Sequence, residues 1–255
     1  MFKGKVQDIQ KDKSMLTKDY IDKIVSDLKV SESYPRIRRS ASGYTPEAAW
    51  WLFEGIARQM VPGFRVTAGR SDAYSALSAW AANLPFRCQD PDTGAWVDGD
   101  PCRGLYIAGN PGSGKTTAVR ILKMMLTAFG AKFTFGGDSL SMWSLSDPSA
   151  AMICDAYARD GSLAYFQSMR IIGIQDLGSE PRETLYMGNR KEVMREFLEL
   201  RGDTPGRLTI ITSNFSFATI RKAYGDRVWS RLHTMCNYVE LVGDDMRVGA
   251  DGGGS

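Results

Sequence analysis

Residues 109–116 combine glycines with a lysine and a threonine in an order that suits the binding of phosphate groups. Gly112 and Gly114 let backbone N–H groups approach a ligand without a Cβ in the way. Lys115 supplies a point charge to the β and γ phosphates, and the Thr116 hydroxyl suits Mg²⁺. The sequence therefore predicts a site for ATP and Mg²⁺. The predicted nucleotide-binding residues are Gly109, Asn110, Pro111, Gly112, Ser113, Gly114, Lys115, Thr116 and Thr117.

Such a site also needs a carboxylate at the end of a buried strand, to hold Mg²⁺ through water and to orient the attacking water. The apolar run Ile171–Ile174 is followed by Gln175 and Asp176. We predict that Asp176 is this catalytic and metal-associated acid, although an aspartate that caps a strand end fits the pattern too. Gln175 cannot supply a negative charge, and Glu180 is a nearby acid that can compensate.

Two kinds of polar residue late in the chain suit phosphoryl transfer. Asn214 follows the apolar run Leu208–Thr212, and an amide at a strand tip can position the attacking water; an ordinary turn asparagine explains it equally well. Arginine stabilises the charge that develops on the transferred group and is often supplied by a neighbouring molecule. The candidates are Arg227, Arg231 and Arg247, with surface ion pairs as the alternative role.

These residues need an alternating framework of strands and helices to bring them together. The expected strands are Leu105–Ala108, Lys132–Phe135, Ile171–Ile174, Leu208–Thr212 and Tyr238–Val242. The expected helices are Thr116–Phe129, parts of 139–168, Lys191–Leu200 ended by Gly202, Ser216–Tyr224 and Asp226–Met235. This order predicts an α/β fold, a P-loop NTPase with a five-stranded parallel sheet flanked by helices.

The chain before this framework is expected to be a small helical region. Its predicted elements are a helix with Ile21, Ile24, Val25 and Leu28 on one face, a linker over Ser31–Tyr44, a helix from Thr45-Pro46 to about Met60, a helix opening at Ser71-Asp72, and a loop or small hairpin over 86–103. We therefore predict a helical N-terminal region at 1–70 with a flexible start, an ATPase domain at 71–248 and a flexible tail at 249–255.

Composition narrows the function less than the motifs do. The chain has 43% hydrophobic and 24% charged residues, as soluble globular proteins do, and 32 Lys and Arg against 29 Asp and Glu, so net charge does not argue for nucleic acid. A membrane span and a signal peptide are not predicted, and a reduced cytoplasm fits best. The four cysteines lack CxxC spacing and His233 is the only histidine, so neither a zinc site nor a disulfide framework is expected.

Several motifs together resemble the DnaC-type and IstB-type branch of the AAA+ ATPases, which are helicase loaders and transposition helpers. The resemblance covers about residues 95–248. The motifs that carry it are GNPGSGKTT, GIQDLGSEP followed by MGN, TIITSN, YGDRVWSRL and GDDMR. It implies the AAA+ (ASCE) type of P-loop fold.

The same resemblance implies roles for single residues. Asn214 becomes the sensor-1 residue, Arg231 the arginine finger with Arg227 as the alternative, and Arg247 the sensor-2 arginine. Members of the family usually carry two adjacent acids where this chain has Gln175 and Asp176. Asp176 then matches the second acid, which polarises water. This departure bears on hydrolysis much more than on ATP binding.

Family members hold single-stranded DNA or wrap duplex DNA in an ATP-dependent oligomer, and their N-terminal segments recruit a replicative helicase or a transposase. For this chain, the resemblance implies a homo-oligomer with the arginine finger acting in trans, DNA contact through residues 139–168, and a protein partner for residues 1–70. The first of these segments and its flank mix aromatic and basic residues, as nucleic-acid surfaces do, although core packing explains the aromatic ones equally well. These residues are Trp143, Tyr157, Arg159, Tyr165 and Arg170.

The leading hypothesis is therefore a replicative helicase loader. The first alternative is an IstB-like transposition regulator that binds target DNA. The second is a weakly hydrolysing, ATP-gated assembly switch, which the neutral Gln175 favours. A small-molecule P-loop kinase is the least supported reading, because it needs a lid and an acceptor site.

Overall fold

A computed structural model of the chain describes Lys18, residues 36–142 and residues 145–242. The chain divides into two compact units, Met1–Arg36 and Ile37–Ser255. Apart from Lys18 and Arg36, the described residues belong to the second unit. Residues 37–70, which the sequence assigns to the N-terminal region, therefore lie in the same compact unit as the glycine-rich loop.

A six-stranded sheet with the order β3-β2-β11-β4-β10-β7 forms the centre of this unit. Its parallel strands are β4 (Gly104–Gly109), β7 (Ile171–Leu177), β10 (Leu208–Ser213) and β11 (Cys236–Leu241). The antiparallel hairpin of β2 (Arg87–Gln89) and β3 (Trp96–Asp98) extends the sheet beside β11, within the stretch predicted as a loop or hairpin. Parallel pairing brings the carboxyl ends of β4, β7 and β10 to one edge, which is where ligands bind in open α/β sheets.

The predicted strand at Lys132–Phe135 forms, but it belongs to a different sheet. This strand, β5 (Lys132–Phe135), pairs antiparallel with β6 (Asp138–Ser141) and with β1 (Arg38–Arg39), which lies in the predicted linker. The position beside β7 is instead occupied by Ser146 and Ser149, through isolated parallel bridges. In β5 only Phe133 is buried, whereas a parallel strand covered on both faces is buried almost throughout. The expectation of five parallel strands in one sheet is therefore wrong, while the α/β class is confirmed.

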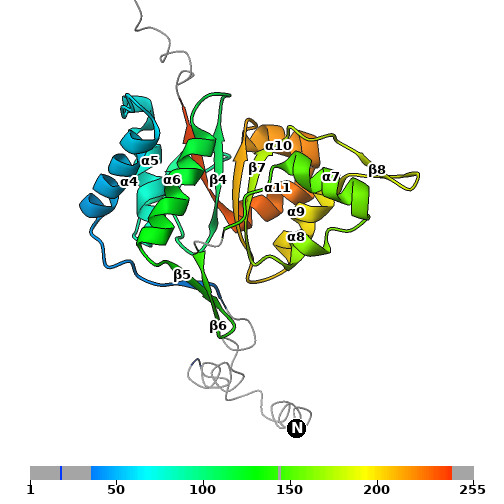
Figure 1. Cartoon of the computed structure of the whole chain (residues 1–255), viewed down its shortest axis with the longest axis horizontal. Helices are drawn as coiled ribbons and strands as arrows, with labels where there is room; N and C mark the ends of the chain where they lie inside the picture. The colour runs from blue at the N-terminus through cyan, green and yellow to red at the C-terminus, as the bar shows by residue number, and fades with distance from the viewer. Residues whose placement is uncertain (1–17, 19–35, 143–144, 243–255) are drawn as a thin grey trace, which may run out of the picture. The chain divides into compact units, whose positions relative to one another are not determined.

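Helices cover both faces of the main sheet and create two hydrophobic cores (Figure 1). The first face carries α4 (Pro46–Met60), α5 (Ala68–Ala81) and α6 (Lys115–Ala128). The second face carries α7 (Ala150–Asp160), α8 (Ala164–Ser168), α9 (Val193–Asp203), α10 (Phe217–Tyr224) and α11 (Asp226–Met235). Strand β4 supplies both cores by alternation, because Leu105 and Ile107 join the first while Tyr106 and Ala108 join the second.

Local capping signals explain several helix starts. Thr45 and Ser216 accept hydrogen bonds from the backbone N–H groups of Ala48 and Thr219, so α4 and α10 begin where predicted. Helix α5 begins at Ala68, before the expected Ser71, and α9 continues through Gly202 to Asp203. A hairpin of β8 (Thr184–Tyr186) and β9 (Asn189–Lys191) precedes α9 and was not predicted.

Candidate functional site

The loop between β4 and α6 has the backbone geometry of a phosphate cradle. Gly112 and Gly114 have φ angles of +77° and +91°, in the left-handed region that favours glycine. A Cβ at Gly109 would lie 2.6 Å from both the Ser113 Oγ and the Leu241 carbonyl oxygen, so no side chain fits there. The Ser113 Oγ is buried and has no hydrogen-bond partner among the described residues. Since α6 begins directly after the loop, its N-terminal N–H groups add to an anion site.

A cavity of about 450 Å³ opens beside this loop. It is lined by Val61, Pro111, Gly112, Gly114, Lys115, Thr116, Thr117, Asp176, Ser179 and Asn214. The cavity thus gathers six of the nine predicted nucleotide-binding residues, together with the predicted acid and the predicted amide. The other three, Gly109, Asn110 and Ser113, do not line it.

Lys115 is the basic residue of this lining and is almost fully buried, with 5% of its surface exposed. Its Nζ donates to the carbonyl oxygens of Gly109 and Asn110, at 2.7 and 2.9 Å, and to the Asn214 Oδ1 at 2.7 Å. Asn214 reaches it from the carboxyl end of β10, directly after Ser213. The structure therefore joins the predicted phosphate lysine to the predicted sensor amide.

Asp176 lies near the carboxyl end of β7 and is exposed to the cavity. Its φ of +54° is unusual for a residue other than glycine, although aspartate tolerates the left-handed region better than most. The Asp176 N–H donates to the Thr212 Oγ1 at 2.9 Å, and the Asp176 carbonyl accepts from the Ser179 N–H and hydroxyl at 3.0 and 2.6 Å. These backbone contacts hold the strained conformation that turns the carboxylate into the cavity.

Gln175 points away from this cavity, into the sheet. It is 8% exposed, and its Oε1 accepts a 2.9 Å hydrogen bond from the Thr212 Oγ1, the same hydroxyl that binds the Asp176 N–H. Thr212 therefore links the neutral Gln175 to the backbone of the acid. Gln175 supports the position of Asp176 but does not itself line the site.

Glu180 does not line the phosphate cavity either, so the structure does not bring it in as a second acid. Its carboxylate accepts from the Gly178 N–H at 2.8 Å and from the Tyr224 hydroxyl at the end of α10. Burial and the neighbouring Glu180 charge raise the pKa of Tyr224, so the phenol stays protonated and donates. This contact ties the loop after β7 to the helix that precedes the candidate finger residues.

The candidate finger arginines lie on α11 and pair with α9. The Arg231 Nη2 is 2.5 Å from Asp203 Oδ1, and the Arg227 Nη2 is 3.1 Å from Asp203 Oδ2. Arg227 also lies 3.4 Å from Glu199. Neither arginine lines the phosphate cavity, and within residues 36–142 and 145–242 no other arginine does. Arg247 lies outside the described residues.

The aromatic and basic residues predicted near segment 139–168 differ in their exposure and contacts. Tyr157 is 8% exposed and packs in the second core, so core packing accounts for it. Tyr165 is 70% exposed, and Arg159 is also exposed. Arg170 pairs with Asp138 at 2.8 Å. Trp143 lies outside the described residues.

Sequence reasoning missed four residues of the site region: Val61, Ser179, Thr212 and Tyr224. Val61 caps the C-terminus of α4 and reaches the cavity only because that helix packs beside α6. The position of Ser179 shortly after the acid was a usable signal, whereas the hydroxyls of Thr212 and Tyr224 act through contacts of 36 and 44 residues in sequence separation.

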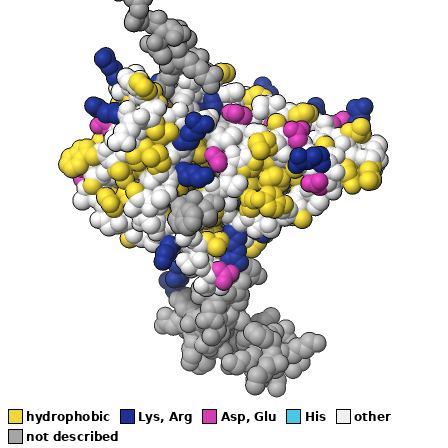
Figure 2. Space-filling model, in the orientation of Figure 1, with side chains coloured by type: hydrophobic (Ala, Val, Ile, Leu, Met, Phe, Trp, Pro, Cys, Tyr) yellow, Lys and Arg dark blue, Asp and Glu magenta, His cyan; other side chains and the backbone are white. Residues whose placement is uncertain are grey.

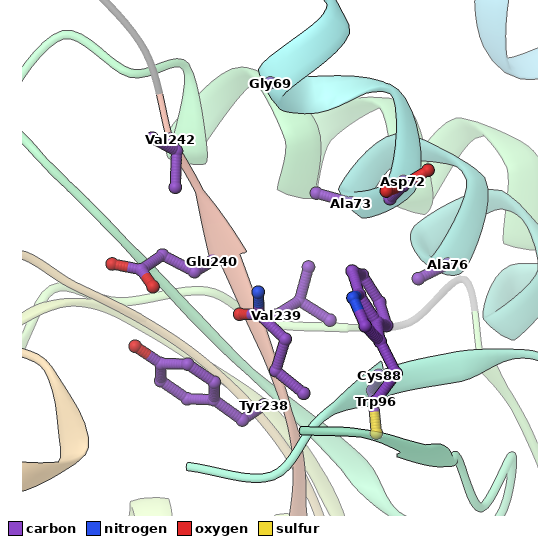
Figure 3. Close-up of a pocket in the computed structure, with 11 residues that line it drawn as sticks. Gly69, Asp72, Ala73, Ala76, Cys88, Trp96, Tyr238, Val239, Glu240 and Val242 are labelled. Atoms are coloured by element: carbon purple, nitrogen blue, oxygen red, sulfur yellow. The ribbon is translucent and has the colours of Figure 1, made fainter. Parts of the chain in front are cut away.

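A smaller hollow of about 180 Å³ lies between α5, β2, β3 and β11 (Figure 3). Trp96 lies beside helix α5, which carries Ala73 and Ala76. None of the predicted site residues lines this hollow. The searched part of the chain contains no group of three or more His, Cys, Asp and Glu residues placed to hold a metal ion. None of its helices is long and apolar enough to cross a membrane.

Strand order and loop geometry together define the class of protein. Strand β10 lies between the loop-bearing strand β4 and the acidic strand β7, and the glycine-rich loop joins a strand to a helix. The chain therefore has an α/β P-loop NTPase fold of the type with an additional strand between these two.

Two solved structures align with about seven tenths of this chain. The crystal structure of the DnaC helicase loader aligns with 70% of this chain and 93% of its own, at 18% identity and a TM-score of 0.48. The structure of AMPPCP-bound DnaA from Aquifex aeolicus aligns with 72% of this chain and 50% of its own, at 17% identity and a TM-score of 0.43. No protein-family model matches the sequence, and no curated protein aligns with it significantly. The classification above rests on strand order and loop geometry.

Proposed function

We propose that this protein is an oligomerising, DNA-associated ATPase that acts as a replicative helicase loader. The observation that carries the ATPase part is the meeting of Lys115, Asp176 and Asn214 at one cavity beside the glycine-rich loop. Lys115 and Asn214 are 99 residues apart in sequence, yet their side chains share a hydrogen bond. The loader role rests on the motifs that resemble the DnaC-type branch.

The residues present fit a triphosphate and its metal ion. The loop N–H groups and Lys115 would bind the phosphates, and Thr116 and Asp176 would hold Mg²⁺, which when bound neutralises the charge that develops on the phosphates. Asp176 is the acid of the cavity lining and would orient the attacking water. Asn214 would place that water relative to Lys115.

ATP binding requires Lys115 to change partners. Its ammonium donates to two loop carbonyls and to Asn214, so a phosphate must replace at least one of these contacts. Asn214 is the acceptor on a different strand from the loop, so this exchange would report nucleotide binding to β10 and α10. We infer that Asn214 senses the nucleotide by this route.

The cavity lining contains one basic residue, Lys115, and no arginine from the described part of the chain. Phosphoryl transfer is greatly accelerated when an arginine from a neighbouring subunit completes such a site. This supports a homo-oligomer in which Arg231, or Arg227, acts in trans on the next subunit. Residues 1–70 would then recruit the protein partner, a replicative helicase.

A second candidate function is an ATP-gated assembly switch that hydrolyses slowly. It is favoured by the buried, neutral Gln175 and by the engagement of Glu180 with Tyr224, which leave Asp176 as the acid of the cavity. Such a protein would bind ATP tightly, assemble, and rely on its partner for release.

ATP turnover and molecular mass, measured together with Mg²⁺ and with single-stranded or duplex DNA, test the proposal. We expect ATP-dependent oligomers and turnover stimulated by DNA, with both lost in Lys115→Ala. Tight ATP binding and assembly with negligible turnover would favour the assembly switch over the loader ATPase. Wild-type protein that binds no nucleotide would overturn both readings. A pull-down with the full chain against a replicative helicase and a transposase separates a loader from a transposition helper.

A further inference from the structure

The β8–β9 hairpin carries a methionine in a turn whose geometry favours asparagine or glycine. Tyr186 and Asn189 pair across the hairpin, so Met187 and Gly188 form its two-residue turn. Their φ angles are +47° and +82°, and a turn with positive φ at both central residues favours Asn-Gly. The left-handed region is unfavourable for a side chain as bulky as that of Met187. Local backbone preference therefore does not explain this methionine, and residues in such conformations cluster at functional sites.

The same turn exposes apolar side chains to solvent. Met187 is 83% exposed and Leu185 is 59% exposed, and we call these two side chains the knob. The hairpin that carries the knob packs closely on α7, because Tyr186 lies on Tyr157 at 5.9 Å between ring centroids and a Cβ at Gly161 would overlap the Tyr186 ring. Figure 1 shows the hairpin projecting beyond α7, and Figure 2 shows hydrophobic and basic side chains together at this end. The knob is therefore held in place before any partner arrives.

The basic residues around the knob are balanced by acids. The ion pairs are Arg182 with Glu192 at 3.0 Å, Arg190 with Glu183 at 3.5 Å and Lys191 with Glu196 at 2.7 Å. Binding to a nucleic acid or to an anionic membrane needs unbalanced positive charge, so these pairs favour a protein partner. Arg190 lies opposite Leu185 in the hairpin and its side chain is 77% exposed. An exposed ion pair is weak, so Arg190 can exchange Glu183 for an acid of that partner.

The hollow of about 180 Å³ between α5, β2, β3 and β11 has the size and chemistry to receive one methionine side chain (Figure 3). Its walls include Ala73 and Ala76 of α5, Val239 of β11 and Trp96 of β3. Trp96 is 39% exposed, and methionine sulfur makes favourable contacts with aromatic rings. Pockets for small-molecule ligands measure about 300–1,000 Å³. This smaller hollow therefore suits a single long side chain.

An acid beside the hollow complements the arginine beside the knob. Asp72 of α5 lines the hollow, is exposed, and has no ion pair among the residues that the structure describes. Glu240 also lines the hollow, but its side chain points with that of Tyr238 away from α5 (Figure 3). No described lysine or arginine is part of the lining. Asp72 and Arg190 therefore give the hollow and the knob opposite charges.

The knob and the hollow lie at opposite ends of the main sheet. The sheet runs from β3, which carries Trp96, to β7, and the hairpin follows β7 in the chain. When one surface of a subunit meets a different surface of the next, the contact is head to tail and produces rings or filaments. We propose that the knob of one subunit inserts into the hollow of the next, with Met187 against Trp96 and Arg190 beside Asp72. This inference rests on the proposed homo-oligomer and adds to it the contact that joins the subunits.

Sedimentation velocity of the full chain with an ATP analogue and Mg²⁺, over a range of protein concentrations, tests the contact. Met187→Asn removes the end of the knob and places a favoured residue in the turn. It should weaken assembly by roughly tenfold, while the melting temperature of dilute protein without nucleotide stays equal or rises. Damage to the fold would lower the melting temperature as well. Trp96→Ala removes a wall of the hollow and should weaken assembly by a similar factor.

An exchange of charges tests whether Arg190 and Asp72 face each other. Arg190→Asp and Asp72→Arg should each weaken assembly by about fivefold, because like charges then meet at the contact. Protein that carries both substitutions should assemble within about threefold of wild type, since the attraction is restored with reversed signs.

A matched control separates the contact from general effects of exposed methionines. Met152→Asn removes a methionine that is 60% exposed on α7 and should assemble within about twofold of wild type. Binding of the ATP analogue to the monomer should be unchanged in all variants, since none of the substituted residues lines the phosphate cavity.

The outcomes separate this inference from the proposed function. Wild-type protein that binds no nucleotide would overturn the proposed function. Wild-type protein that hydrolyses ATP but stays monomeric would overturn the homo-oligomer and this contact together, and would leave the ATPase activity standing. Oligomers that form equally well in Met187→Asn and Trp96→Ala would overturn the contact alone. Failure of the double charge exchange to restore assembly would exclude the pairing of Arg190 with Asp72.

Discussion

At the scale of single residues, the site is organised by two hydrogen-bonding groups that a motif search treats as accessories. Asn214 accepts from Lys115, and Thr212 supports both Asp176 and Gln175 through one hydroxyl. A hydrogen bond to a charged group contributes about 1.5–3 kcal/mol, more than one between neutral groups. Without nucleotide, Lys115 is therefore held by specific hydrogen bonds, and the phosphates of ATP must compete with these acceptors.

Asn214→Asp tests this competition. A carboxylate beside the Lys115 ammonium should stabilise the protein without nucleotide by about 1 kcal/mol and weaken ATP binding by about tenfold, because it repels the phosphates and holds the lysine more firmly. Thermal denaturation and calorimetric titration measure the two effects. Unchanged ATP affinity in Asn214→Asp would mean that breaking the contact between Lys115 and residue 214 costs no binding free energy. Asn214→Ala is the control for loss of the amide.

Thr212→Val removes the hydroxyl that links Gln175 to the acid. The Asp176 N–H and the Gln175 amide lose a partner in a largely buried place, so we expect a loss of about 1–3 kcal/mol in the free energy of unfolding and a lower turnover of ATP. Gln175→Glu is the matched variant, since it keeps an acceptor for Thr212 and adds a charge. Urea denaturation and turnover under saturating ATP measure both. A steep rise in the turnover of Gln175→Glu would instead identify Gln175 as the restraint on hydrolysis.

At the scale of elements, helix α10 connects the nucleotide site to the candidate finger segment. It starts at Phe217, three residues after Asn214, and ends at Tyr224, whose hydroxyl donates to Glu180. Helix α11 follows after Gly225 and carries Arg227 and Arg231. A displacement of Asn214 by nucleotide would therefore be transmitted along one short helix to both arginines.

Tyr224→Phe removes the contact that holds Glu180. We expect a loss of about 1.5–3 kcal/mol in stability, because a partly buried carboxylate loses a donor. Turnover per folded molecule should stay within about twofold, since Asp176 is the acid of the cavity. If turnover rises in Tyr224→Phe and falls again when Glu180→Gln is added, then Glu180 is a compensating acid that the tyrosine restrains.

At the scale of the whole molecule, the arginines and the phosphate cavity belong to different parts of the second unit. Arg227 and Arg231 face α9 and share Asp203, while the cavity is lined by the glycine-rich loop and the ends of β7 and β10. Both ion pairs are partly exposed, so they contribute little to stability and can be exchanged for a phosphate at low cost. This arrangement suits a finger that acts on a neighbouring molecule.

Mixed oligomers test the arrangement directly. Arg231→Ala should bind ATP within about twofold of wild type but lose at least about a hundredfold in assembled turnover. An equimolar mixture of Arg231→Ala with Asp176→Asn, which keeps the phosphate-binding loop and Lys115, should recover turnover, because a subunit with an intact cavity can then face one with an intact arginine. Arg227→Ala, used in place of Arg231→Ala, is the control for loss of an arginine that pairs with the same Asp203. Mixed oligomers that remain inactive would place the arginine's role within its own subunit.

The sequence by itself determined the parts of this protein that depend on local chemistry. Glycine spacing around Lys115 defines the loop, an apolar run ending in Asp176 defines the acidic strand, and the Thr45 and Ser216 hydroxyls define helix starts. Each of these signals acts over a few residues of backbone, so it can be recognised from the sequence alone. The α/β class follows from their order.

Only the tertiary structure decided which groups meet across long sequence separations. Strand β5 pairs in a small antiparallel sheet, and this pairing was not predicted because its partners β1 and β6 lie in stretches without a strong strand pattern. The contacts of Gln175 with Thr212, of Glu180 with Tyr224 and of Arg231 with Asp203 were not predictable from the sequence either. Sheet pairing and helix packing bring these partners together. Such contacts depend on the register of strands and the facing of helices, which hydrophobic packing of the whole chain sets.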